Sequence, residues 1–506
     1  MKIEKTLLYW TFLFLYTFSC GTKNSSKKEF IFPESEKDLL ANALKDKLAN
    51  TFDGEKNKAA NFLIDNLYHN YNNSILQSNE YYYLHDLQNG NVQYFKDNIE
   101  QAFTAYKIRK KEISFNLFLE YVLPHRIEGE KSENWRCHVL RDFSGLKDTI
   151  DHLSAKESVS KINDELKRSF YFSSRELPSH TLSWTDLRSI GKGDCWSMAK
   201  IAVFSCRAFG LPVSIDFTPG WANINGGHAW NSLVTGDSSS TPFMGAEANP
   251  GEYDPLALYG SFKKTAKIFR KTYSIQKNKL LSNTGQNEHT PYPFNDPRII
   301  DVTSQYLQTT EITLDLPFPA SDKSFFYLCI YNNGDWIPVD WSENSSGSVV
   351  FKNLGKDIVY ILGKYQDKTV IPIGSPMLLH NNNALYKLKP NYKKTIDIDI
   401  KTLQSLELDV LKLVNQGLDW EEFVSQIDEL KKGNERSKPE IGKQYTLYYW
   451  SNTWINHQTV TVDKDLLIFK NAPSNSIYKV VDESTLSSKA GTERPFVYKD
   501  AEQIWY

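Results

Sequence analysis

The residue types needed for nucleophilic catalysis occur in order within the stretch 191–251. Cys195 precedes an apolar run, and His228 begins a second one. Glu247 and Asn249 follow further along. A thiol attacks a carbonyl carbon when a base takes its proton, and an acid or amide can orient the imidazole that serves as the base. This order predicts a catalytic site made of a cysteine, a histidine and a third group that is acidic or an amide.

The residues around Cys195 predict that it opens a helix. Asp194 can act as the N-cap after the flexible segment 191–193, and small or apolar residues then recur at helical spacing. Gly210 is expected to close the helix, and Pro212 prevents its continuation. Because backbone N–H groups and the helix dipole favour a thiolate, we expect the pKa of the thiol to fall. The like charge of Asp194 opposes that shift.

Strands predicted after this helix would carry the other two groups. Residues 213–217 and 228–234 read as strands because they are rich in apolar residues and are bounded by glycine or proline. A short third strand is expected at 242–248, carrying Glu247, with Asn249 immediately after it. The predicted site therefore lies where a helix N-terminus meets a sheet.

Three short motifs resemble the core of the transglutaminase-like superfamily. They are Gly-Asp-Cys-Trp at 193–196, Arg-x-x-Gly-Leu-Pro-Val at 207–213 and Gly-His-Ala-Trp at 227–230. The resemblance implies a papain-like α+β core. It also implies that Cys195 is the nucleophile and His228 the general base.

The third catalytic position departs from the pattern of that family, in which an Asp-Pro pair is common. Asn249 stands before Pro250, where that Asp would lie, and Glu247 is close by. Glu247 is the first choice because a carboxylate also stabilises the imidazolium, and Asn249 is the alternative. Cys206, further along the same helix and away from its N-terminus, is expected to be a core residue.

The resemblance implies a thiol enzyme that acts on amide bonds, with hydrolysis by a protease or amidase expected ahead of crosslinking. Its partners would be protein, peptide or peptidoglycan-like amide substrates. The sequence has no CxxC pair, no HExxH, no GxSxG and no Walker loop, so neither a metal nor another cofactor is expected. The alternative is a catalytically inactive lipoprotein that binds peptide or glycan.

The first twenty residues have the pattern of an export signal. Two lysines precede an apolar run at 6–18, which is too short to span a membrane. Cys20, followed by Gly21, resembles the lipid-attachment cysteine of bacterial lipoproteins. We therefore expect a protein of the bacterial cell envelope that a lipid on Cys20 holds to a membrane. A plain secretory signal is the alternative.

Length and composition indicate several domains and exclude one class of partner. The chain has 506 residues, and 59 basic against 61 acidic residues give a net charge of −2, so no general attraction to nucleic acid is expected. The expected fold class is α+β. The expected order is a signal peptide at 1–20, a tether at 21–33, a helical N-terminal region at 34–150, a transglutaminase-like core at 151–290, a β-sandwich-like module at 291–395, a helical insert or linker at 396–440, and a second β module at 441–506.

An aromatic and charged segment at 115–136 precedes the core. It combines an apolar helix, a proline stop and then Arg126, Glu128, Trp135 and Arg136. We expect it to lock the helical region onto the core through Arg–Glu pairs and a buried Trp135. The alternative is that it lines one side of the catalytic cleft.

The C-terminal part contains two similar sets of strands. Residues 327–362 and 445–480 share an aromatic strand, an Asn-containing turn, a tryptophan, Phe-Lys-Asn and another strand. This indicates two related β modules. Trp336 and Trp454 are expected to be core residues of these modules, and stacking on a glycan is the alternative.

Overall fold

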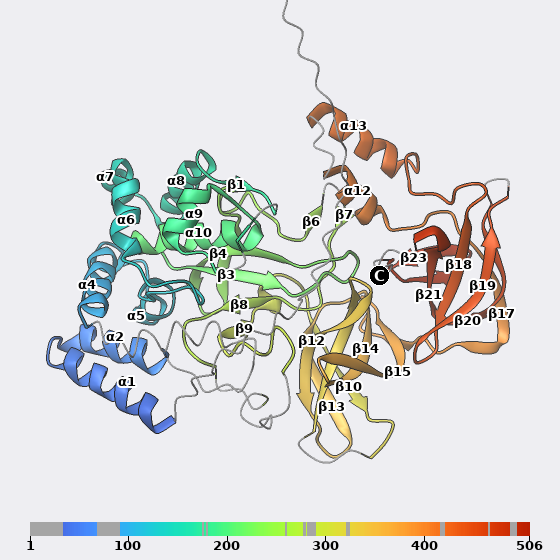
Figure 1. The fold of residues 1–506 in the computed structure, drawn as a ribbon, viewed down its shortest axis with the longest axis horizontal. Coiled ribbons are helices and arrows are strands. Elements are labelled where there is room, and N and C mark those ends of the chain that lie inside the picture. The colour runs from blue at the N-terminus through green and yellow to red at the C-terminus, as the bar shows by residue number, and fades with distance from the viewer. Residues whose placement is uncertain are drawn as a thin grey trace, which may run out of the picture.

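The chain has an α+β fold, in agreement with the sequence. The computed structural model describes residues 34–67, 92–174, 177–178, 181–258, 261–276, 280, 290–319, 324–414, 420–463, 466–485 and 493–506. The expected signal peptide, the tether and Cys20 lie outside the described residues. Figure 1 shows helices at one end of the molecule, a mixed core beside them and two β-rich parts at the other end. None of the described helices is long and apolar enough to cross a membrane.

The helical N-terminal region is built on apolar faces that pack against one another. Its helices are α1 (Glu34–Ala49), α2 (Gly54–Asp65), α4 (Val92–Arg109) and α5 (Phe115–Leu117), and a π-helical turn, η1 (Phe118–Val122), follows α5. Leu48, Leu63, Ile99 and Phe118 are fully buried in one cluster. The cluster also includes Val234 and Tyr273 of the core, so this region packs directly on the core.

The segment 115–136 locks the helical region onto the core, as expected, but through different bonds. Trp135 is buried and donates from Nε1 to the His125 carbonyl at 2.8 Å. The buried guanidinium of Arg136 donates to the Arg207 carbonyl at 2.9 Å and to the Leu123 and Pro124 carbonyls, both at 3.2 Å. Arg136 therefore joins the two regions through backbone carbonyls.

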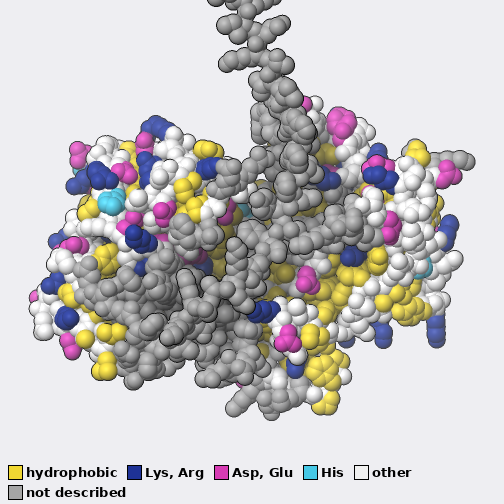
Figure 2. Space-filling view, viewed as in Figure 1, with side chains coloured by type: hydrophobic (Ala, Val, Ile, Leu, Met, Phe, Trp, Pro, Cys, Tyr) yellow, Lys and Arg dark blue, Asp and Glu magenta, His cyan; other side chains and the backbone are white. Residues whose placement is uncertain are grey.

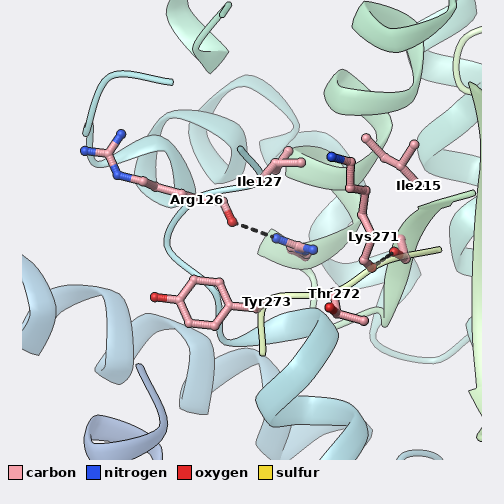
Figure 3. A pocket seen from close by; sticks show the side chains of 8 residues that line it. Arg126, Ile127, Ile215, Lys271, Thr272 and Tyr273 are labelled. Atoms are coloured by element: carbon pink, nitrogen blue, oxygen red, sulfur yellow. Dashed lines mark hydrogen bonds between the residues drawn. The ribbon is translucent and has the colours of Figure 1, made fainter. Parts of the chain in front are cut away.

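A small polar pocket marks this joint. Figure 3 shows it between the loop that carries Arg126 and the strand that carries Lys271, and a dashed line from the Arg126 carbonyl marks the hydrogen bond that Arg207 donates at 3.1 Å. Lys271 pairs with Asp296 at 2.6 Å and with Glu128 at 3.4 Å. Burial alone would raise the pKa of Glu128, but Lys200 and Lys271 outweigh it and lower that pKa to about 2. The pocket is thus part of the structural joint.

The core is one antiparallel sheet with a central helix packed on it. The strand order is β5 (Ser239–Phe243), β4 (His228–Gly236), β3 (Val213–Thr218), β8 (Phe269–Lys271) and β9 (Ile299–Asp301). Helix α10 (Cys195–Ala208) packs on β3 and β4. The remaining short elements are α6 (Trp135–Asp142), η2 (Ser144–Leu146), α7 (Lys147–Ile150), α8 (Ala155–Lys167), β1 (Tyr171–Phe172), α9 (Trp184–Ile190), β2 (Lys192–Gly193), β6 (Ala257–Leu258), β7 (Ser261–Phe262) and η3 (Thr303–Gln305).

Helix α10 is the hub of the core. Every residue from Ser197 to Ala208 is buried, because the helix is covered by the sheet on one side and by α6, α8 and α9 on others. Cys206 is among these buried residues, as expected for a core thiol. A helix enclosed in this way holds its first residue in a fixed place relative to β3 and β4.

The two β modules have the same strand connections. The first consists of β10 (Thr310–Asp315), β11 (Phe325–Asn332), β12 (Asp335–Glu343), β13 (Ser348–Leu354), β14 (Ile358–Gln366), β15 (Thr369–Leu379) and β16 (Leu385–Lys387). The second consists of β17 (Asn391–Asp399), β18 (Gln444–Trp450), β19 (Trp454–Thr461), β20 (Ile468–Ser474), β21 (Ile477–Asp482), β22 (Phe496–Lys499) and β23 (Glu502–Trp505), with η4 (Glu483–Thr485) after β21. In each module the first and fourth strands pair, and the other five form a second sheet in equivalent order.

Two boundaries differ from those expected. Strand β9 lies at 299–301, inside the expected first β module, yet it pairs with β8 of the core. Strand β17 spans the expected end of the first module, yet it pairs with β20 of the second. The helices α12 (Leu406–Val414) and α13 (Trp420–Lys431) are therefore an insertion within the second module and not a linker before it.

An aromatic cluster joins the two modules. Trp336 is only 3% exposed and meets Trp450 edge-on at 5.5 Å between ring centroids. Trp454 is half-buried and meets Tyr331 at 5.8 Å and Trp450 at 5.2 Å. These tryptophans pack at the contact between the two modules and not, as expected, in the core of each module.

Buried Arg494 ties the core and both modules together. It donates to the Tyr331 carbonyl of the first module and to the Ala222 carbonyl of the core. It also donates to the Tyr506 carbonyl at 2.9 Å. Figure 1 shows the C-terminus in the middle of the molecule, between the core and the β modules.

Candidate active site

Cys195 is the first residue of α10, as the sequence predicts. Asp194 has the extended backbone of an N-cap, with φ −72° and ψ −178°, and its carboxylate accepts from the Ser197 backbone N–H at 2.9 Å. The helix ends at Ala208, and Gly210 then adopts a left-handed φ of 75°. The sulfur thus stands at the N-terminus of a long, buried helix.

His228 is the first residue of β4 and pairs in register with Thr218 at the end of β3. The glycine before it is required because a Cβ on Gly227 would lie 2.6 Å from the Thr218 carbonyl oxygen. The backbone of Ala229, the next residue, is close enough to the Cys195 sulfur to lower the pKa of the thiol. The structure therefore brings the start of β4 to the thiol, as predicted.

The imidazole of His228 is held by a tyrosine and two tryptophans. Its Nε2 lies 2.7 Å from the hydroxyl oxygen of Tyr253. Its ring stacks on Trp230 at 5.9 Å between centroids and lies 6.3 Å from Trp221. These contacts fix the plane of the ring and engage Nε2, which leaves Nδ1 as the nitrogen available for proton transfer.

The environment keeps the Cys195 thiol protonated at rest. Burial raises its pKa to about 11, the Asp194 carboxylate adds to the rise, and backbone N–H groups including that of Ala229 offset it only in part. The expected fall in the pKa of this thiol is therefore wrong. A group enclosed by protein loses the hydration that stabilises its charged form, and here this outweighs the helix N-terminus.

His228 is neutral at rest. Burial lowers the pKa of its imidazole to about 3, and the positive charge of Lys263 contributes. The resting pair is therefore a neutral thiol beside a neutral imidazole. Such a pair can react only when the imidazole takes the proton during attack on a carbonyl.

Glu247 and Asn249 do not hold the imidazole. Glu247 lies in the turn after β5, not on a strand, and is exposed. Asn249 donates to Asp164 at 2.9 Å and accepts from Asn163 at 3.1 Å, so both ends of its side chain are bound to α8. Among the described residues, neither makes a hydrogen bond to His228.

Tyr253 occupies the place where an acid or amide was expected. Burial raises the pKa of its phenol far above the ordinary value, and the Glu247 carboxylate is the second cause. Glu247 is therefore close enough to act on the phenol, while the phenol contacts the imidazole. Sequence reasoning missed Tyr253 because no spacing rule separates it from the other 27 of the 28 tyrosines.

Lys263 is a second residue that sequence reasoning missed. Its Nζ lies 4.9 Å from the centre of the Trp221 ring. Burial lowers its pKa to about 8, although Asp254 and Glu247 act in the opposite direction. A lysine whose pKa is lowered therefore lies close enough to His228 to affect the charge of its imidazole.

No metal centre is found in the part of the chain that the structure describes. Nowhere there do three or more His, Cys, Asp or Glu side chains gather in a way that could hold a metal ion. The site described above consists of amino-acid side chains and backbone N–H groups.

Residues 145–239 match the family model of the transglutaminase-like superfamily. This span contains Cys195 and His228, and the chain therefore carries a transglutaminase-like core. None of the curated protein sequences matches the chain.

Similar solved structures include calcium-bound LapG of Legionella pneumophila. It is 16% identical, with 33% of this chain and 82% of that chain covered at a TM-score of 0.20. Red sea bream transglutaminase is 9% identical, with 69% of this chain and 71% of that chain covered at a TM-score of 0.20. Similarities this low carry no argument about activity.

Proposed function

We propose that this protein is a thiol enzyme that acts on amide bonds of proteins or peptides, with Cys195 as nucleophile and His228 as general base. The observation that carries the proposal is that Cys195 begins α10 and His228 begins β4, the strand on which α10 packs, with the Ala229 backbone close to the Cys195 sulfur. This arrangement places the residue next to His228 against the thiol at a helix N-terminus, within a core that matches a family of such enzymes.

The first step forms a bond from sulfur to carbon. His228 takes the thiol proton as the sulfur attacks the substrate carbonyl, and the carbonyl electrons move onto its oxygen. The backbone N–H of Cys195, at the N-terminus of α10, is placed to stabilise that oxyanion. The oxyanion then collapses, the carbon–nitrogen bond breaks, and the imidazolium returns its proton to the leaving amine.

The second step releases the acyl group from the sulfur. We propose that water is the acceptor, which makes the reaction hydrolysis by a protease or amidase, ahead of crosslinking. His228 removes a proton from water as it attacks the thioester, and the thiol then regains a proton. Exposure of Gly227 and of Tyr292 beside the site supports water as the acceptor.

Tyr253 is the positioning residue in this mechanism. Its phenol oxygen lies 2.7 Å from Nε2 and so can accept the proton of that nitrogen, which turns Nδ1 toward the thiol. A neutral phenol orients the ring but gives the imidazolium less charge stabilisation than a carboxylate would. The nearby Glu247 carboxylate raises the pKa of the Tyr253 phenol, and its negative charge would supply part of the stabilisation of the imidazolium.

The rate of alkylation of Cys195 by iodoacetamide against pH tests the proposal. A Cys20→Ser, Cys137→Ser background removes the cysteine of the first twenty residues and the exposed thiol of the described residues, while Cys206 and Cys329 are buried. We expect a plateau across neutral pH that is assisted by His228, followed by a rise toward pH 11. His228→Ala should abolish the plateau. An ordinary titration near pH 8.5 that does not respond to His228→Ala would refute the thiol–imidazole pair.

A binding protein with an inactive core is the second candidate. The observation that favours it is the phenol at the position where a carboxylate or amide orients the imidazole in related enzymes. In that case the β modules would bind peptide or glycan. The same alkylation experiment separates the candidates, because a protein without catalysis has no reason to keep a plateau that depends on His228.

We also propose that the protein is held in the bacterial cell envelope by a lipid on Cys20. The support is the sequence: a short apolar run ends at Cys20 and is followed by a polar segment. Cys20→Ser should move the protein from the membrane fraction to the soluble fraction after cell lysis. A variant that stays in the membrane fraction would contradict the proposal.

A further inference from the structure

A cleft separates the core from the first β module next to the candidate active site. Its volume is about 320 Å³, within the range typical of ligand sites. The core contributes Pro219, Gly227 and Tyr292, and the two hairpins of the module contribute Asp335, Tyr365 and Lys368. Figure 1 shows β12 and β14, which carry these hairpins, beside the core near the centre of the molecule.

The cleft is lined by residues that are neighbours of His228 in the chain and in the sheet. Gly227 directly precedes His228, and Pro219 directly follows Thr218, the residue paired with His228. Tyr292 is 49% exposed, and the Cys195 thiol is among the groups that raise its pKa, although burial is the main cause. A molecule bound in the cleft therefore lies next to the end of β4 that begins with His228.

We propose that this cleft is a substrate-binding subsite that holds an extended peptide segment on the amine side of the bond to be cleaved. This inference rests on the proposed function. His228 must protonate the leaving amine, so that part of the substrate lies on the histidine side of the sulfur. The cleft is lined by Gly227, which precedes His228, and by Pro219, which follows the partner of His228 on β3, so it lies at the end of the sheet where the imidazole stands. That is the side that the amine portion occupies.

The lining fits a peptide better than a sugar or a polyanion. Asp335 and Lys368 are exposed and of opposite charge. Figure 2 shows that basic and acidic side chains are interspersed on the visible surface of the described residues. Tyr292 and Tyr365 offer partly exposed rings for side chains. Trp336, the largest aromatic group in the lining, is 3% exposed and packed against Trp450, so it presents no open ring face for a sugar.

Iodoacetyl dipeptides test the subsite, because their peptide extends from the amide nitrogen as the leaving amine does. Rates of Cys195 alkylation by these probes are divided by the rate with iodoacetamide, using the full chain with Cys20→Ser and Cys137→Ser. We expect the best dipeptides to react about tenfold faster than iodoacetamide. Tyr365→Ala and Lys368→Asn should remove most of that advantage, and asparagine keeps the left-handed φ of 65° at position 368.

A control variant and the iodoacetamide rate distinguish the outcomes. Tyr386→Ala changes a tyrosine of the same module that is 52% exposed and outside the cleft, and it should leave the ratio unchanged. Loss of the His228-dependent iodoacetamide plateau would refute the proposed function itself. An intact plateau with a dipeptide advantage that survives both cleft variants would overturn the subsite. A larger advantage for N-iodoacetyl-glucosamine, lost in the same variants, would overturn the peptide assignment.

Discussion

The side chain of Asn332 in the first β module is hydrogen-bonded to the backbone of Gly226 in the core. Its Nδ2 donates to the Gly226 carbonyl and its Oδ1 accepts from the Gly226 N–H, both at 3.0 Å. The same Nδ2 donates to the Trp221 carbonyl at 2.8 Å. The loop that leads into His228 is therefore held from outside the core, by the module that also lines the cleft.

Asn332→Ala should lower activity although Asn332 is not in the catalytic site. It removes the hydrogen bonds to the Trp221 and Ile224 carbonyls and to the Gly226 N–H, which should reduce the free energy of unfolding by about 3 kcal/mol. We expect kcat to fall about tenfold because the imidazole loses its fixed position. Hydrogen exchange of residues 221–227 should quicken in parallel.

Two further variants make this prediction specific. Asn332→Asp keeps the acceptor for Gly226 and loses the donor, so its effect should be intermediate. Asn383→Gly, in another turn of the same module where φ is 68°, should leave kcat unchanged. If Asn332→Ala kept wild-type kcat and slow exchange in the loop, the module would have no role in placing His228.

Tyr253→Phe should lower kcat about tenfold to hundredfold and leave KM unchanged, because only the contact with His228 Nε2 is lost. Glu247→Gln should have a smaller effect, since Glu247 acts through the phenol. Asn249→Ala should mainly lower the melting temperature, because it removes bonds to α8. If Asn249→Ala lost more activity than Tyr253→Phe, then Asn249, which stands where the family has its Asp, would be the residue that orients the imidazole.

Lys263→Met should move the low-pH fall in the rate of Cys195 alkylation, which reports protonation of His228, to higher pH. The positive charge of Lys263 disfavours the imidazolium, so removing it raises the pKa of His228 from about 3 toward its ordinary value. Burial, the larger cause, persists, so the fall should stop short of pH 6.5. Lys161→Met, which changes an exposed lysine on α8, is the control and should leave the pH of this fall unchanged.

His228→Gln should make folding less sensitive to acid. The pKa of His228 in the folded protein is about 3, whereas the unfolded chain binds this proton near pH 6.5. Between these values the unfolded state holds more protons, so stability present above pH 6.5 is lost as the pH falls. The drop in melting temperature from pH 7.5 to pH 5 should be smaller in His228→Gln than in wild type. An equal drop in both proteins would contradict a neutral, buried imidazole.

The sequence predicted the parts of the site that depend on local rules. The N-cap at Asp194, the stop at Gly210 and the strand that begins at His228 are each set by neighbouring residues, and all three are found. Tyr253 could not be predicted in this way, because it reaches the imidazole from a loop whose path depends on the whole core. The prediction of a lowered pKa for Cys195 was wrong for the same reason, since burial is a property of the tertiary fold.

The predicted domain boundaries differ from the structure at strands that are polar or short. Strand β17 exposes Asn391 to Thr395, including two lysines, so it lacks the alternation that marks a half-buried strand. Strand β9 has three residues, too few to show any period. The repeat itself was recognisable because its aromatic strands are the buried ones, such as β11 and β18.

The neutral thiol–imidazole pair also determines how Cys195 responds to oxidants. Peroxides attack the thiolate form of cysteine, and a thiol whose pKa is raised to about 11 offers almost none of that form at neutral pH. Sulfur becomes strongly nucleophilic only while His228 takes its proton, as it attacks an electrophile beside the imidazole. The resting thiol of Cys195 is thus a poor target for oxidants that require the thiolate.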